Sequence, residues 1–112
     1  MTNNDNENSD STIIRISIGY FQAEQTEQVA FMLDNEFKNS LVPAIQKLKG
    51  NKGYFVGIDK EKHSLTNVSF WKSYEDALQM ATLKEMLDMR ITFEALGLKF
   101  IEITNHEVLW EL

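Results

Sequence analysis

Two kinds of hydrophobic repeat alternate along this chain of 112 residues and restrict the folds it can adopt. Apolar residues recur at every second position in strand-like segments and at every third or fourth position in helix-like segments. The order is strand, helix, strand, strand, helix, strand, at residues 13–21, 26–48, 53–59, 64–72, 73–97 and 99–112. Two helical crossovers around one antiparallel sheet predict an α+β fold of the ferredoxin-like βαββαβ type.

The first helical segment contains the only proline of the chain, Pro43. Proline lacks an N–H group and disfavours a helical residue before it. We therefore expect a kink or break near residues 39–42, with Pro43 in the first turn of a second short helix. Gly50 and Gly53 are expected to end the segment. The polar residues 60–63 are few enough to form a hairpin loop between the second and third strands.

The second helix is expected to start at Ser73 and to end at Gly97. Asp76 lies three positions after Ser73, a spacing that is typical of a capping box. The last strand region is expected to be interrupted by a bulge near residues 104–106. The buried stripe of the helix is expected to contain Met80, Leu83, Leu87, Ile91 and Ala95.

The net charge of −6 is divided evenly between a short tail and the body of the chain. Residues 1–12 contain three acidic and no basic residues, so we expect a disordered tail before a single domain over residues 13–112. The body has no cluster of Lys and Arg, which argues against nucleic-acid binding. No apolar run reaches about 18 residues and the tail does not resemble a secretory signal, so we expect no membrane span and a cytoplasmic location.

The metal-binding residue types are scarce in this chain, which has no Cys and two His, His63 and His106. The absence of Cys excludes disulfides and thiolate metal sites. The two His are far apart and neither belongs to a spaced ligand pair, so we expect no metal site and surface positions for both.

The predicted strands carry apolar residues on both faces, unlike a sheet that has one side in water. Two strands show this pattern: Tyr54, Val56 and Ile58 against Phe55 in the second, and Val68 and Phe70 against Leu65 and Trp71 in the third. The first strand has an apolar face of Ile14, Ile16, Ile18 and Tyr20, and its other face, with Arg15, Ser17, Gly19 and Phe21, is only half apolar. Two helices cover only one face, so we expect a second copy to cover the other in a homodimer.

Two alternatives to the homodimer remain at this stage. The sheet could be an ordinary half-buried one. The chain could also be a ferredoxin-like monomer that senses a small ligand or binds RNA, although RNA recognition would require basic flanks beside the aromatic residues.

Residues 67–77 (NVSFWKSYEDA) run from an apolar strand through a Trp-x-Ser junction into an acid-rich helix start. Residues 41–45 (LVPAI) precede Gly50 and the strand at Gly53. Together these stretches resemble the antibiotic biosynthesis monooxygenase family. The resemblance implies a dimeric α+β barrel with a pocket between each sheet and its helices. In better-known members of that family, such pockets hold aromatic polyketides or quinol-like molecules, which O2 oxidises without metal or flavin.

The resemblance also implies which residues form the site. Asn67 and Trp71 are four apart on one strand, hence on one face, and are similar to an Asn and a Trp of the polyketide-oxidising branch; they are the expected catalytic residues. No cofactor and no metal are implied. As an alternative, Trp71 is a core aromatic whose N–H finds a local partner, and the methionines fill the core. The expected substrate-binding residues are Arg90, Tyr74, Met80, Leu83 and Leu87.

Other positions depart from the family pattern. Ala77 stands where that branch has a Tyr, and the second strand has no His near Gly57. The helix positions that correspond to the haem-degrading branch hold Met80 and Arg90, so haem degradation is not expected. Two functions remain open: a cofactor-independent monooxygenase acting on a small aromatic or quinol-type substrate, and a non-catalytic dimeric barrel that binds a small apolar ligand or has a structural or stress-related role.

Overall fold

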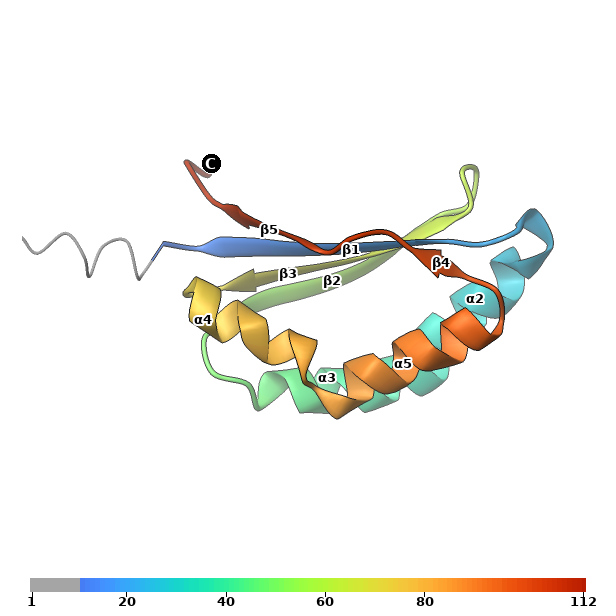
Figure 1. Ribbon diagram of the computed structural model, residues 1–112, viewed down its shortest axis with the longest axis horizontal. Coiled ribbons are helices and arrows are strands. Elements are labelled where there is room, and N and C mark those ends of the chain that lie inside the picture. Colours follow the sequence, from blue (N-terminus) through green and yellow to red (C-terminus); the bar gives the residue numbers. More distant parts are fainter. Residues whose placement is uncertain (1–10) are drawn as a thin grey trace, which may run out of the picture.

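The computed structural model describes residues 11–112, which form one antiparallel sheet with helices on one side (Figure 1). The predicted α+β ferredoxin-like fold is confirmed, with each crossover and the last strand divided into shorter pieces. Here η1 and η3 are 3-10 turns and η2 is π-helical. In chain order the elements are β1 (Ile13–Tyr20), η1 (Ala23–Gln25), α2 (Thr26–Met32), η2 (Leu33–Phe37), α3 (Lys38–Gln46), β2 (Asn51–Asp59), β3 (Ser64–Trp71), α4 (Tyr74–Ala77), η3 (Leu78–Ala81), α5 (Lys84–Ala95), β4 (Lys99–Phe100) and β5 (Thr104–Glu107).

The strand order is β2-β3-β1-β4, and β5 also pairs with β1, beyond β4 on the same edge. All pairings are antiparallel. The second and third strands form the predicted hairpin, in which Asp59 pairs with Ser64 around residues 60–63. β2 starts at Asn51, so Gly53 lies inside the strand, beside a bulge, and does not end the preceding segment.

The predicted break near residues 39–42 is wrong. The backbone stays helical from α2 to the end of α3, and Pro43 lies inside α3. The irregular stretch of this helical segment is η2, which precedes the predicted break. Leu41 and Ile45, on either side of Pro43, are both buried, while Pro43 and Asn39 face the solvent. Because Pro43 has no N–H group, the Asn39 carbonyl has no helical donor and faces the solvent instead. Packing of the buried side chains against the core maintains the helix.

The second crossover begins as predicted, because the Ser73 hydroxyl accepts a hydrogen bond from the Asp76 N–H at 3.1 Å. It is not one helix, however. The chain leaves the helical conformation at Leu83, whose ψ of 122° is extended, and α5 follows. This break changes the helical phase, so the predicted stripe is mostly wrong. Met80 is buried and Leu83 partly so, but the outer positions of the stripe are exposed: Leu87, Ile91 and Ala95. The positions buried in their place on α5 are Met89 and Phe93.

The end of α5 and the last strand follow the prediction in part. Gly97 has a φ of +96°, and the Leu98 N–H donates to the Phe93 carbonyl, a hydrogen bond that closes the helix end. The final strand is interrupted at residues 101–103, three positions before the predicted bulge. Most of the predicted tail, residues 1–10, lies outside the described residues. Thr12 is held by hydrogen bonds from Val108 and Lys52, so the ordered body begins before residue 13.

The two faces of the sheet differ in what covers them. All the helices lie on one side, whereas the other side is uncovered and the C-terminal segment rises away from the helices (Figure 1). The core fills the space between sheet and helices, and its fully buried large side chains are Trp71, Phe93, Leu41, Leu65, Met89 and Val29. The uncovered side, which we call the open face, carries Ile14, Ile16, Ile18, Tyr20, Phe55, Val68 and Phe70.

Candidate functional site

A pocket of about 150 Å³, here called the β1–β3 pocket, lies between the covered face of those two strands and the second crossover. Its floor is polar and its walls are largely methionine, a side chain that adapts to flat apolar ligands. The floor consists of Arg15, Ser17, Asn67 and Ser69. The walls and mouth consist of Met80, Ala81, Met86, Leu87, Met89, Arg90, Phe100 and Ile103.

The strand register explains why four polar residues meet on the floor. Arg15 pairs with Ser69, and Ser17 pairs with Asn67, across β1 and β3. Paired residues in an antiparallel sheet point to the same side, and that side is the helix-covered one. Three of them are almost fully buried, with exposures of 8% for Arg15, 3% for Asn67 and 2% for Ser69.

Asn67 has an unused hydrogen-bond donor. Its Oδ1 accepts a hydrogen bond from the Tyr54 hydroxyl at 2.5 Å, but its Nδ2 is buried without a partner in the described part of the chain. Burial raises the pKa of the Tyr54 hydroxyl above its ordinary value of 10.0, so this group stays protonated and donates. Tyr54 thus fixes the amide, and the free Nδ2 donor is available to a ligand.

Arg15 is a buried cation that forms no ion pair with any residue of the described range 11–112. The salt bridges of the described residues are Lys84–Asp88 and Arg90–Glu94, both on the surface of α5. Burial lowers the pKa of the Arg15 guanidinium from its ordinary value of 12.5, and Tyr74 opposes that shift electrostatically. A guanidinium stays charged despite such shifts, so the floor carries a positive charge.

Arg90 occupies the mouth of the pocket in a different setting. Its Nε lies 3.1 Å from Glu94 Oε2, and its guanidinium lies 5.1 Å from the centre of the Phe100 ring. Both contacts satisfy the cation at the protein surface. The two arginines of the pocket therefore differ: Arg90 has a counter-charge, and Arg15 forms no salt bridge within the part of the chain that the structure describes.

The structure gathers four of the predicted site residues at this pocket, Asn67, Arg90, Met80 and Leu87. The other three, Trp71, Tyr74 and Leu83, do not line it. Asn67 and Trp71 do share the covered face, as predicted. Trp71 is fully buried, however, and its Nε1 donates to Ser69 Oγ at 2.8 Å, which matches the alternative of a core aromatic with a local partner.

Tyr74 and Leu83 are displaced for simple geometric reasons. Tyr74 is the first residue of α4 and is 54% exposed. Leu83 lies at the break before α5 and packs against the core. The floor residues Arg15 and Ser17 were not predicted. A signal for them existed, because Arg15, Ser17 and Gly19 share one face of the first strand, but the alternation does not say which face the helices cover.

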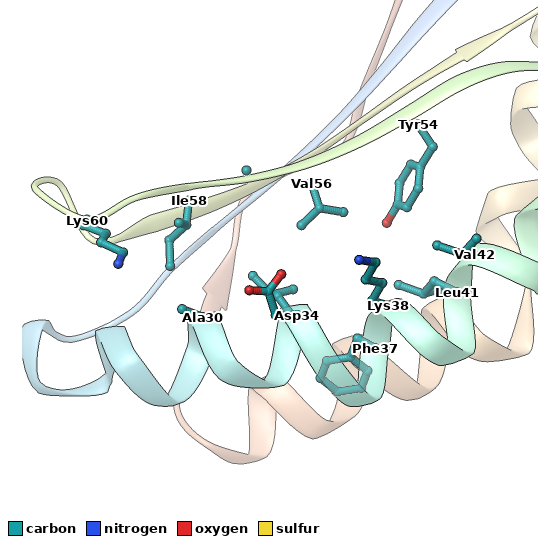
Figure 2. A pocket seen from close by; sticks show the side chains of 12 residues that line it. Ala30, Asp34, Phe37, Lys38, Leu41, Val42, Tyr54, Val56, Ile58 and Lys60 are labelled. Carbon is teal, nitrogen blue, oxygen red and sulfur yellow. The ribbon is translucent and has the colours of Figure 1, made fainter.

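A second pocket, of about 400 Å³, lies between β2 and the first crossover. Figure 2 shows Tyr54, Val56 and Ile58 pointing from β2 toward the helices, with Asp34 and Lys38 facing them. None of its lining residues has a buried unpartnered polar atom within the described chain. Tyr54 lines this pocket while its hydroxyl bonds to Asn67 of the β1–β3 pocket, so this hydrogen-bonded pair lies between the two.

Residues 11–112 contain no group of three or more His, Cys, Asp or Glu side chains that could hold a metal ion. Within the same range, no helix has both the length and the apolar character needed to cross a bilayer.

No protein-family model and no curated protein matches the chain. Solved structures do match. A "putative antibiotic biosynthesis monooxygenase" from Deinococcus radiodurans has a TM-score of 0.68 at 14% identity, over 89% of this chain and 95% of that one. A conserved protein from Methanosarcina mazei Go1 has a TM-score of 0.65 at 18% identity, over 91% and 97%. SnoaB, a cofactor-independent oxygenase from Streptomyces nogalater, has a TM-score of 0.62 at 11% identity, again over 91% and 97%.

The chain shares their fold. The resemblance seen at the Trp-x-Ser junction is thereby confirmed at the level of architecture, over nearly the whole length of each protein. Identities of 11–18% carry the fold alone, so activity has to be argued from the pocket.

Proposed function

We propose that this protein is a cofactor-independent monooxygenase that acts on a small aromatic or quinol-type substrate in the β1–β3 pocket. The observation that carries the proposal is the buried, unpartnered Nδ2 of Asn67, next to Arg15 and facing a methionine-walled space. The shared fold with a cofactor-independent oxygenase supports the same conclusion.

Oxidation by O2 without a cofactor requires a substrate that gives up electrons easily, which phenols do once they are deprotonated. The floor favours this ionised form, because Arg15 supplies positive charge and Asn67 supplies a hydrogen-bond donor for an oxyanion. The buried position of both groups strengthens these interactions. Met80, Met86 and Met89 would exclude water from the bound ring.

The substrate supplies all four electrons that reduce O2. For a hydroquinone, one oxygen atom enters a ring C–H position and the other leaves as water, so that hydroquinone and O2 give hydroxyquinone and water. The substrate's hydroxyl protons pass to solvent or to the departing oxygen. No group with a titration near neutral pH lines the pocket, so Asn67 and Arg15 act by binding the anion and not by proton transfer.

We also propose that the protein works as a homodimer joined through the open face. Seven apolar side chains lie on this one side of the sheet, and Tyr20 and Phe55 are 46% and 64% exposed. A contiguous apolar surface of this kind is typical of an association site. Two sheets packed through these faces would form the barrel that the family resemblance implies.

The test of catalysis is oxygen uptake with a panel of hydroquinones and anthrones. We expect wild-type protein to consume O2 and to place one atom of ¹⁸O2 in the product. Asn67→Ala should lower kcat by about 10- to 100-fold, because the removed donor binds the oxyanion. Asn51→Ala, which changes a half-buried Asn outside the pocket, should retain wild-type rates.

Trp71→Phe gives a second, smaller effect, because Trp71 holds Ser69 and does not line the pocket. It should act as a positioning change that raises KM more than it lowers kcat. Binding of aromatic ligands without oxygen uptake would instead favour the non-catalytic dimeric barrel. Equal rates in wild type and Asn67→Ala would remove Asn67 from the reaction.

A further inference from the structure

The proposed reaction requires only positive charge from Arg15 and makes no specific use of its guanidinium group. It is 8% exposed, lines the pocket floor, and has no carboxylate partner among the described residues. A buried charge without a counter-charge destabilises a protein by several kcal/mol. Its presence therefore points to a ligand that brings the missing negative charge.

Within residues 11–112, no carboxylate forms a salt bridge with Arg15. Its neighbours across the two adjacent strands are Ser69 and Asn105, which are both neutral. Tyr74 acts on it electrostatically but is largely exposed. Two acidic residues lie near this part of the fold. Glu107 is diagonal to Arg15 on β5 but is exposed and forms no salt bridge within the described residues, and Glu94 is already engaged by Arg90. The Arg15 guanidinium is therefore available to an anionic ligand that enters the pocket.

The second donor on the floor sets the length of that ligand. Asn67 is the diagonal neighbour of Arg15, because Arg15 pairs with Ser69 and Asn67 is two residues away on the same face. Diagonal neighbours in an antiparallel pair are about 7–8 Å apart. A rigid aromatic molecule that carries an anionic group and, further round the ring, a hydroxyl can reach both.

The volume of the β1–β3 pocket limits the width of the ligand. A pocket of about 150 Å³ is comparable to a cavity that holds one benzene ring. The methionine walls suit the flat face of such a ring. A guanidinium recognises a carboxylate through two parallel hydrogen bonds, which a phenolate oxygen cannot form.

From these features we propose that the pocket takes a single-ring aromatic carboxylate of the dihydroxybenzoate type, with its carboxylate on Arg15 and a ring hydroxyl on the free Nδ2 of Asn67. This proposal rests on the proposed function for the choice of an oxidisable ring. It adds the substrate class, an acid in place of a neutral quinol, and it assigns a role to a residue that the first strand contributes.

The test compares two matched probes, gentisate (2,5-dihydroxybenzoate) and hydroquinone, which differ only in the carboxylate. Calorimetric titration under nitrogen measures binding without turnover. We expect wild-type protein to bind gentisate at least about tenfold more tightly than hydroquinone, as one charge-assisted bidentate contact provides. Arg15→Met should abolish this preference, because it weakens gentisate binding much more than hydroquinone binding, and Arg15→Lys should restore part of the preference.

Arg90→Met is the matched control, since it removes the other guanidinium of the pocket, which already has Glu94 as partner. It should keep the preference for gentisate. Circular dichroism of each variant verifies folding, and Arg15→Lys keeps the test meaningful if Arg15→Met does not fold. Equal binding of the two probes by wild type, no binding of gentisate at millimolar concentration, or a preference that survives in Arg15→Met would each overturn the proposal.

Oxygen uptake with the same two probes separates this proposal from the proposed function. Gentisate that binds through Arg15 but is not oxidised would sustain the acid site and remove the monooxygenase. Oxidation of hydroquinone by a protein that shows no preference for gentisate would sustain the monooxygenase and remove the acid site.

Discussion

The two faces of the sheet depart in different ways from those of an ordinary half-covered sheet. The face under the helices contains Arg15 and Asn67, while the face without a cover carries residues such as Ile16 and Val68. In an isolated domain, burial favours the reverse arrangement. This difference is the basis of both proposals, a ligand that meets the polar groups inside and a second copy that covers the apolar groups outside.

The largest expected effect comes from placing a charge on the open face. Val68→Glu puts a carboxylate beside Ile16 and Phe55 in the middle of the sheet. Burying it on both sides of a symmetric interface should weaken the dimer by at least about 100-fold. Light scattering after gel filtration should show the mass fall to one chain.

Phe31→Glu is the control for this variant, because Phe31 is 68% exposed on α2, away from the sheet. It should leave the mass unchanged. A wild-type protein with the mass of a single chain, or a Val68→Glu variant that stays dimeric, would contradict an interface at the open face.

The next effect concerns the covered face. Arg15→Met replaces a buried, unpaired cation by an apolar side chain of similar length, so we expect the free energy of unfolding to rise by about 1–3 kcal/mol. Urea denaturation measures it. Arg90→Met, at a partly exposed position paired with Glu94, should change stability by less than about 0.5 kcal/mol. A loss of stability in Arg15→Met would show that the cation has a partner within the protein.

A third effect depends on pH and reports the burial of Tyr54. Its pKa is higher in the folded than in the unfolded protein, so above about pH 10 the unfolded state releases a proton that the folded state retains. Stability contributed by this group is therefore present below pH 10 and is lost as pH rises, by about 1.4 kcal/mol per unit. Tyr54→Phe should lose stability less steeply between about pH 10 and 11.

The comparison of the same two proteins near pH 8 provides the control for this titration. There the difference should be constant and reflect only the lost hydrogen bond to Asn67, about 1 kcal/mol. A slope in Tyr54→Phe identical to that of wild type above pH 10 would mean that the hydroxyl is open to water.

The smallest effect is expected at the edge of the open face. Phe55 is 64% exposed on β2, an edge strand, and its ring lies perpendicular to that of Phe70 with centres 5.9 Å apart. Phe55→Ala should weaken the dimer only about three- to tenfold, as measured by sedimentation. A loss as large as that of Val68→Glu would place the centre of the interface at β2 instead of at β1 and β3.

Part of the candidate site could be predicted from the sequence, and the failures concern how segments are placed relative to one another. Asn67 and Trp71 were correctly placed on one strand face, because side chains alternate strictly along a strand. Leu83 and Leu87 were assigned to a single helical stripe, which the break at Leu83 divides. Arg15 was missed because alternation separates two faces without saying which one is covered.

The sequence by itself determined the features that depend on neighbours along the chain. These are the order of elements, which side chains of a strand share a face, the Ser73 cap, and the end of the second crossover at Gly97. Only the tertiary structure decided that Pro43 stays within a helix and that the face of β1 with Arg15 and Ser17 lies under the helices. These outcomes depend on packing between segments far apart in sequence. Such contacts outweigh local preference, which is worth only a few kcal/mol even at a proline.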